Sequence, residues 1–154
     1  MRYQRFDGRI VVRLERGESL DQALTQLTRT EGIGYADVSA AGAVSWVRLG
    51  YWHPDTHKYE YHEFDEQLEV VSFQGNISLE PGGEPHLHIH GVFGRPDYSV
   101  VGGHVQDLRV NPTFELWLRA EDIPIRRKKD QATGLELLDL PESPQASPQK
   151  KRAA

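Results

Sequence analysis

The sequence contains no cysteine. Disulfide bonds and thiolate metal sites are therefore excluded, which leaves histidine and carboxylate side chains as the strong metal ligands. No apolar run approaches the roughly 20 residues that are needed to cross a bilayer. The first ten residues, MRYQRFDGRI, also lack the apolar segment of a secretory signal. We therefore expect a cytoplasmic protein that does not span a membrane.

Positive charge is scarce in the first 125 residues, which hold 11 Lys/Arg against 19 Asp/Glu, a net charge of −8. Residues 126–154 hold 7 against 4, a net charge of +3. Duplex DNA is bound largely through cationic contacts to its phosphates. The acidic part of the chain is thus a poor DNA-binding surface, unless the arginines of residues 2–16 form a stripe with RRKK at 126–129.

The 154 residues are long enough for one domain with a hydrophobic core. The segment ESLDQALTQLTRTEG predicts a helix, because Ser19 is a good N-cap with Gln22 three residues later, and Gly32 suits the C-terminal end. One face of this helix is apolar and should pack against a sheet; it comprises Leu20, Ala23, Leu24 and Leu27.

Strand patterns dominate the rest of the sequence. GRIVVRLERG alternates between polar and apolar residues before the helix, and a series of short strands separated by turn signals follows it. This order predicts an α+β domain with a mostly antiparallel sheet over residues 1–140. ELLDL at 136–140 is a candidate last strand. The segment from 141 to 154, rich in Pro, Ser and Gln, predicts a disordered basic tail.

The segment PHLHIH places His86, His88 and His90 at alternate positions, so a strand would present all three on one face. Each step of two residues advances about 6.6–6.8 Å, which allows two imidazoles to reach one ion but makes three in a line difficult. His104, in the segment VGGH, is the natural additional ligand. A hairpin centred on Pro96 would place His104 opposite His88, and Gly102-Gly103 would allow a bulge or a close approach of backbones.

Three histidine ligands leave a coordination position open, as in catalytic zinc sites. Without a thiolate to select zinc, manganese, iron, nickel and cobalt stay possible. His53, His57 and His62 are interpreted as polar residues on solvent-exposed strand faces.

Catalysis by such a metal is an alternative, with Glu84, Glu69 or Asp97 near the ion to help activate water. The glutamate that follows the histidines in cupins is absent here. The sequence also contains no nucleophile elbow, P-loop or dinucleotide fingerprint. A binding or regulatory module is therefore favoured over an enzyme.

Several segments together resemble the plants and prokaryotes conserved domain, the PPC domain. They are Gly17-Glu18 before the helix, Gly42-Ala43-Val44, the stretch from Glu69 to Ile77, His86-Leu87-His88 and Gly102-Gly103-His104. The resemblance covers roughly residues 8–140 in the order of the family pattern. It implies an α+β domain with a largely antiparallel sheet that assembles as a homotrimer.

The resemblance also implies a bound divalent metal, usually interpreted as zinc in bacterial and archaeal members. It maps the ligands onto His86, His88 and His104, and His90 is a further candidate at a position where the family pattern varies. In plants the domain is fused to AT-hooks, which bind A·T-rich DNA, and this fusion is the source of the DNA-binding label. Only Gly94-Arg95-Pro96 is similar to an AT-hook here, and a turn explains it.

We therefore predict a homotrimeric metal-binding protein of the PPC type. A DNA-binding regulator that uses the basic segments is the first alternative, although no residue can be assigned to DNA. A metal-dependent enzyme is the second.

Overall fold

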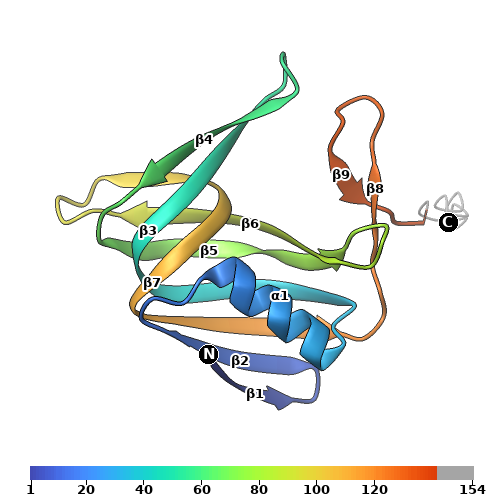
Figure 1. Cartoon of the computed structure of the whole chain (residues 1–154), viewed down its shortest axis with the longest axis horizontal. Helices are drawn as coiled ribbons and strands as arrows, with labels where there is room; N and C mark the ends of the chain where they lie inside the picture. Colours follow the sequence, from blue (N-terminus) through green and yellow to red (C-terminus); the bar gives the residue numbers. More distant parts are fainter. Residues whose placement is uncertain (142–154) are drawn as a thin grey trace, which may run out of the picture.

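In the computed structural model, which describes residues 1–141, a seven-stranded antiparallel sheet is combined with one helix and a separate two-stranded hairpin (Figure 1). The elements are β1 (Arg2–Phe6), β2 (Arg9–Glu15), α1 (Leu20–Glu31), β3 (Tyr35–His53), β4 (Lys58–Phe64), β5 (Leu68–Leu79), β6 (Pro85–Gly94), β7 (Val100–Glu121), β8 (Arg127–Lys129) and β9 (Glu136–Leu138). The predicted α+β class is confirmed. Apart from Pro141, the segment predicted as a disordered tail lies outside the described residues.

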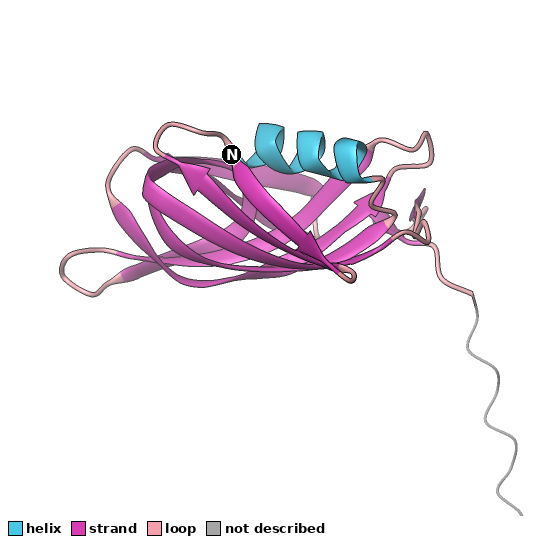
Figure 2. Ribbon diagram, turned by 90° about the horizontal axis from the view of Figure 1, so that it is seen from below, coloured by secondary structure: helices cyan, strands magenta, loops and turns pink. Residues whose placement is uncertain are grey.

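The strand order in the large sheet is β1-β2-β7-β6-β5-β3-β4, and β7 also pairs with β3. The beginning of β7 pairs with β6 and its end pairs with β2, whereas β3 runs beside β7 along most of its length. Strands β3, β5, β6 and β7 therefore pair in a closed circuit, and the sheet curves strongly (Figure 2). No helix in the described part of the chain is long and apolar enough to cross a membrane.

The helix begins and ends as the sequence predicts. The Ser19 hydroxyl accepts a hydrogen bond from the backbone N–H of Gln22, and Gly32 closes the helix with a φ of 63° in the left-handed region. The helix lies along one face of the sheet (Figure 2). Its apolar side is buried there in one core with residues from the neighbouring strands, including Leu24, Leu27, Ile10 and Leu116. The predicted packing of helix against sheet is confirmed.

Several strands are longer than predicted because they continue through irregular positions. The sequence indicates two separate strands on either side of Gly42. In the structure β3 continues through Gly42, and the register of its pairing with β5 and β7 shifts there. Asn-Pro is a typical turn signal, yet Asn111-Pro112 lies inside β7, between positions that pair with β3 in different registers. A proline at a break in the ladder loses no regular hydrogen bond there. The sequence pattern did not predict β1 and β8.

Candidate metal centre

The three alternating histidines of β6 lie on the same side of that strand, as predicted. Between them, Ile89 is fully buried and Leu87 packs against the core. This alternation follows from the pleat, because side chains two residues apart point to the same face. The apolar residues thus fix the strand against the core and turn His86, His88 and His90 away from it.

The predicted hairpin between β6 and β7 exists, but its register differs from the prediction. His104 pairs with His90, not with His88, and Gly94 pairs with Val100 across the turn. The turn is centred on Asp97, whose carboxylate accepts hydrogen bonds from the backbone N–H and the hydroxyl of Ser99. Moving the centre by one residue moves the partner of His104 by two, so His104 still faces the same side as the β6 histidines.

His88, His90 and His104 form one compact group. Their ring centroids are 5.4 Å apart for His88–His90, 5.8 Å for His88–His104 and 5.6 Å for His90–His104. One ring nitrogen from each residue lies within 4.8 Å of the other two. The structure thus brings together three of the four histidines that the sequence indicated as candidates.

His86 lies outside this group. Its Nδ1 atom contacts the carboxylate of Glu80, in the segment that leads from β5 to β6. The reason is the course of β7, which pairs with β6 only from His90 to Gly94 and then continues beside Leu49 of β3. Beyond His90, the strand that carries His104 has left β6, so His104 can approach His88 but not His86.

Gly102 and Gly103 allow the backbones to approach closely, which was one of the two roles considered for them. A Cβ atom on Gly102 would lie 2.9 Å from the carbonyl oxygen of Gly91, and one on Gly103 would lie 2.9 Å from that of Gly50. The pairing between β6 and β7 shows no bulge here. The two glycines therefore position His104 by letting β7 fit between β6 and β3.

The electrostatics favour a neutral imidazole at His88 and at His104. Burial lowers the pKa of His104 to about 4, helped by the neighbouring charges of His88, His90, His86 and Arg127. The pKa of His88 is also lowered, by burial first and by the charge of Arg127 next. A neutral imidazole keeps the lone pair that binds a metal, whereas an imidazolium does not.

The residues fit a metal ion in two further respects. The Nδ1 atom of His104 is buried and has no hydrogen-bond partner among the described residues, an arrangement that a metal bond would satisfy. Ligand atoms in a tetrahedral zinc site stand about 3.3 Å apart, given bonds of about 2.0 Å. The 4.8 Å limit for this group is wider, so small rotations of the imidazole rings would close the site.

The histidines border a cavity of about 750 Å³ between the sheet, the β3–β4 hairpin and the β8–β9 hairpin. His86, His88 and His104 line it from the sheet, and Arg127 and Glu136 line it from β8 and β9. Aromatic and apolar side chains complete the walls, among them Trp52, Tyr59, Leu135 and Leu137. A cavity of this size is in the usual range for small-molecule sites.

The three carboxylates considered for activating water do not line this cavity. Glu84 forms an ion pair with Arg29, and Asp97 is held in the β6–β7 turn. Glu69 pairs with Ala43 and Gly94, in the part of β5 far from His86 and His88. The structure therefore places none of the three carboxylates in the lining of the cavity.

Two polar residues of the cavity were missed by the sequence interpretation. Arg127 belongs to the basic run RRKK, a pattern typical of solvated surface, yet it is only 5% exposed. Glu136 belongs to the segment proposed as the last strand, where its charge carried no signal of burial. Both border the same cavity as His88 and His104, because Arg127 ties β8 to Ser78 and Asn76 of β5. No local sequence pattern encodes this contact.

A curved antiparallel sheet with three clustered histidines, two of which line a cavity, defines a protein with a candidate metal site. The family model of the Plants and Prokaryotes Conserved (PCC) domain matches residues 1–121, so the chain belongs to this family. The resemblance seen in the sequence is thereby confirmed.

Solved structures with the same fold include three close matches. A candidate DNA-binding protein from Bacteroides thetaiotaomicron has 27% identity and a TM-score of 0.85, with 90% of this chain and 96% of that chain covered. A metal-containing protein from Archaeoglobus fulgidus has 32% identity and a TM-score of 0.77, with 84% and 91% covered. A plant- and prokaryote-conserved protein from Pyrococcus horikoshii has 25% identity and a TM-score of 0.79, with 92% and 96% covered. No curated protein matches the chain.

Proposed function

We propose that this protein binds one divalent metal ion per chain through His88, His90 and His104, and that zinc is the preferred ion. The observation that carries the proposal is the convergence of three ring nitrogens within 4.8 Å. Two of the three residues, His88 and His104, also line the cavity. The metal-containing relative from Archaeoglobus fulgidus supports it, since 84% of this chain is covered at 32% identity. In this ligand set, His90 takes the place that the sequence analysis gave to His86.

Three imidazoles would leave one coordination position of a tetrahedral ion open toward the cavity. When bound there, zinc would polarise an oxygen ligand as a Lewis acid. The chain itself contributes three clustered imidazoles, a close approach of backbones at Gly102 and Gly103 that positions His104, and the neighbouring cavity. We therefore propose a ligand-binding module with a metal at its base as the primary role, ahead of an enzyme.

The test is metal analysis of protein that was purified without a polyhistidine tag and then dialysed against zinc. We expect one zinc ion per chain in the wild type and less than about 0.2 in His88→Ala and His104→Ala. His62→Ala is the matched control, because His62 is exposed on β4 and should leave the zinc content unchanged. Full zinc content in His104→Ala would contradict the proposal.

His86 and His90 distinguish the two possible ligand sets. We expect His90→Ala to lose stoichiometric zinc and His86→Ala to retain it, because Glu80 and not the histidine group contacts His86. The reverse result would restore the set His86, His88 and His104 and would mean that the β6–β7 hairpin rearranges when the metal binds.

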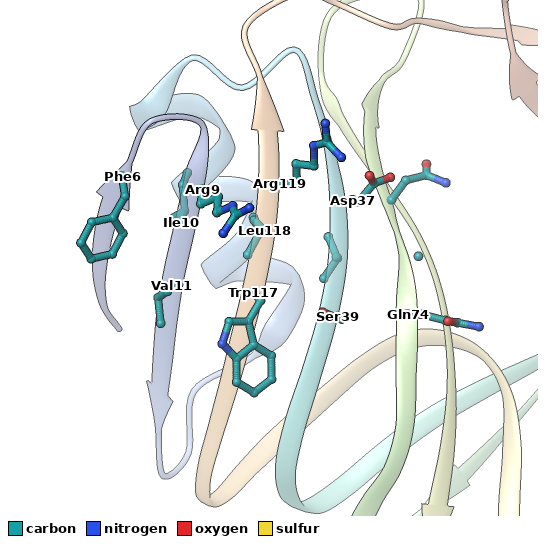
Figure 3. Close-up of a pocket in the computed structure, with 13 residues that line it drawn as sticks. Phe6, Arg9, Ile10, Val11, Asp37, Ser39, Gln74, Trp117, Leu118 and Arg119 are labelled. Carbon is teal, nitrogen blue, oxygen red and sulfur yellow. The ribbon is translucent and has the colours of Figure 1, made fainter.

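We further propose that the protein is a homotrimer, as the family resemblance implies. The supporting observation is an apolar patch on the sheet face that points away from α1 (Figure 3). Phe6 is 49% exposed, Val11 43% and Trp117 45%, and Val11 pairs with Trp117 across β2 and β7. Exposed apolar side chains gathered on neighbouring strands are typical of protein interfaces.

Light scattering at micromolar concentration tests the assembly. We expect a mass of about three times 17.5 kDa for the wild type and a smaller mass for Trp117→Arg. Val71→Arg is the control, because Val71 is 64% exposed on β5 and does not border the hollow that contains Trp117. A wild-type mass near that of the monomer would contradict the proposal.

A further inference from the structure

Arg127 is a buried cation without a carboxylate partner in the part of the chain that the structure describes. Its Nε atom donates to the Ser78 hydroxyl at 2.7 Å, Nη1 donates to the Glu136 carbonyl at 2.6 Å and Nη2 donates to the Asn76 side-chain oxygen at 3.0 Å. All three acceptors are neutral. A guanidinium carries five N–H donors, so each terminal nitrogen keeps one N–H that these contacts do not use.

This arrangement is costly unless a negative charge is supplied. Moving a charged group out of water is unfavourable by several kcal/mol, and buried charges in proteins are normally paired. Desolvation accordingly lowers the pKa of Arg127, whereas the carboxylates of Glu80 and Glu136 oppose that shift from a distance. Neither carboxylate lies within ion-pair distance of Arg127 among the described contacts, and Glu80 is held by His86.

The same cavity also contains an acceptor without a donor. The Oε2 atom of Glu136 is buried and has no hydrogen-bond partner among the described residues. Glu136 and Arg127 both line the cavity beside His88 and His104. Two N–H groups of Arg127 and one carboxylate oxygen of Glu136 are thus unused by hydrogen bonds among the described residues, and both residues line the cavity.

We propose that this cavity binds a small hydroxycarboxylate, whose carboxylate accepts hydrogen bonds from Arg127 and whose hydroxyl donates one to Oε2 of Glu136. The planar guanidinium matches a carboxylate in a two-bond contact. The hydroxyl satisfies the acceptor that the protein leaves open. Trp52, Tyr59 and Leu137 supply apolar surface for the carbon atoms of the ligand.

The ligand would also lie next to the proposed metal. Arg127 bonds to Asn76, and Asn76 pairs with His88 across β5 and β6. The guanidinium is thereby held beside the histidine group on the adjacent strand. An oxygen of the hydroxycarboxylate would fill the open coordination position; this single contact rests on the proposed function, whereas the contacts to Arg127 and Glu136 do not.

The experiment measures the binding of glycolate by calorimetry, with glycolamide as a neutral ligand of the same shape. Wild-type full-length protein is compared in its metal-free and zinc-loaded forms. We expect glycolate to bind the metal-free protein at least about tenfold more tightly than glycolamide does, since hydrogen bonds to a charged group are worth that much. Zinc should strengthen glycolate binding further.

The variants are Arg127→Met, which removes the charge and keeps an extended side chain, and Arg126→Met as the matched control. Arg126 is the exposed neighbour that donates to the backbone oxygens of Glu80 and Pro81. We expect Arg127→Met to lose the preference for glycolate while it retains zinc, and Arg126→Met to behave as the wild type. Glycolate binding that is unchanged in Arg127→Met would overturn the proposal.

Because Arg127 also ties β8 to β5, its replacement could loosen the hairpin. A second measurement therefore uses only the wild type and follows the backbone amide signals of Arg127, Glu136 and Leu137 by NMR during titration. Shifts with glycolate and not with glycolamide support the anion site. Equal shifts, or none, overturn it.

The two proposals fail separately. If zinc does not bind but metal-free protein selects glycolate through Arg127, the metal site is wrong and the anion site stands. If zinc binds to the three histidines but glycolate shows no preference over glycolamide in either form, the metal site stands and the anion site is wrong.

Discussion

Replacing Gly75 by alanine should damage both the sheet and the metal site, although Gly75 is not a ligand. Gly75 lies in β5 between Val38 of β3 and Ile89 of β6. A Cβ atom built there would lie 2.1 Å from the carbonyl oxygen of His88 and 2.7 Å from the Cα atom of Ile89. Both are backbone atoms, so no side-chain rotation relieves the contact.

The magnitude follows from that distance. Ordinary van der Waals contact begins near 3.4 Å, so the His88 backbone would have to move by about 1.3 Å. Overpacking of this kind costs about 1–3 kcal/mol, and close contacts with backbone atoms of both His88 and Ile89 place Gly75→Ala at the upper end. With a slope of about 2 kcal/mol per molar urea, the midpoint of unfolding should fall by roughly 1–1.5 M.

The shift also displaces a proposed ligand, because the affected carbonyl belongs to His88. We expect zinc affinity to fall by roughly 10–100-fold, the usual effect of disturbing the groups that orient metal ligands. Urea unfolding of the metal-free protein and competitive zinc titration measure the two effects separately. Gly82→Ala is the control, since a Cβ atom there meets nothing within 4 Å and no positive φ opposes it. A Gly75→Ala protein as stable as Gly82→Ala would refute this reasoning.

Three further predictions concern other parts of the molecule. Ser19→Ala removes the cap of α1 and two hydrogen-bond contacts to Asp107, and should lower the free energy of unfolding by about 1–2 kcal/mol in urea titrations. Hydrogen bonds from Thr133 lower the pKa of Asp130. They therefore stabilise the folded protein at pH values above the ordinary pKa of 3.8, and this stabilisation is lost as the pH falls through the lower pKa of the folded state. NMR titration should show that low pKa, and Thr133→Ala should raise it toward 3.8. Protein truncated after Leu140 should not bind a labelled A·T-rich duplex at submicromolar concentration in 150 mM salt by fluorescence anisotropy; such binding would favour the DNA-binding alternative.

Local signals allowed much of the fold to be predicted from the sequence. Ser19 and Gly32 mark the ends of α1 by their own conformational preferences, and the alternation in residues 9–15 indicates a strand with one buried face. These features depend only on residues close together in the chain. The predicted turn near Pro96 is of the same kind, since Gly, Pro and Asp favour turns by themselves.

The details of the site were not predictable in this way, because they depend on where strands separate. The residue that pairs with His104 is set by a turn in which Tyr98 adopts a φ of 66°. A positive φ is uncommon for tyrosine, so the sequence does not predict it. Whether His86 or His90 joins the group depends on the point at which β7 leaves β6 for β3. The position at which β7 leaves β6 is fixed by close backbone contacts at Gly102 and Gly103. The spacing of the histidines in the sequence does not predict this position.

The arginines show how a charge pattern can mislead when its partners are distant in sequence. Arg5 pairs with Glu31 and Asp122, and Arg13 pairs with Glu15, so part of the positive charge on the first strands is neutralised. Arg127 is buried in the cavity. Cations that are neutralised or buried cannot release counterions from DNA, and that release supplies most of non-specific DNA affinity. Arg127, in the basic run that most resembles a DNA contact in the sequence, is thus buried, and we assign it to the proposed anion site instead.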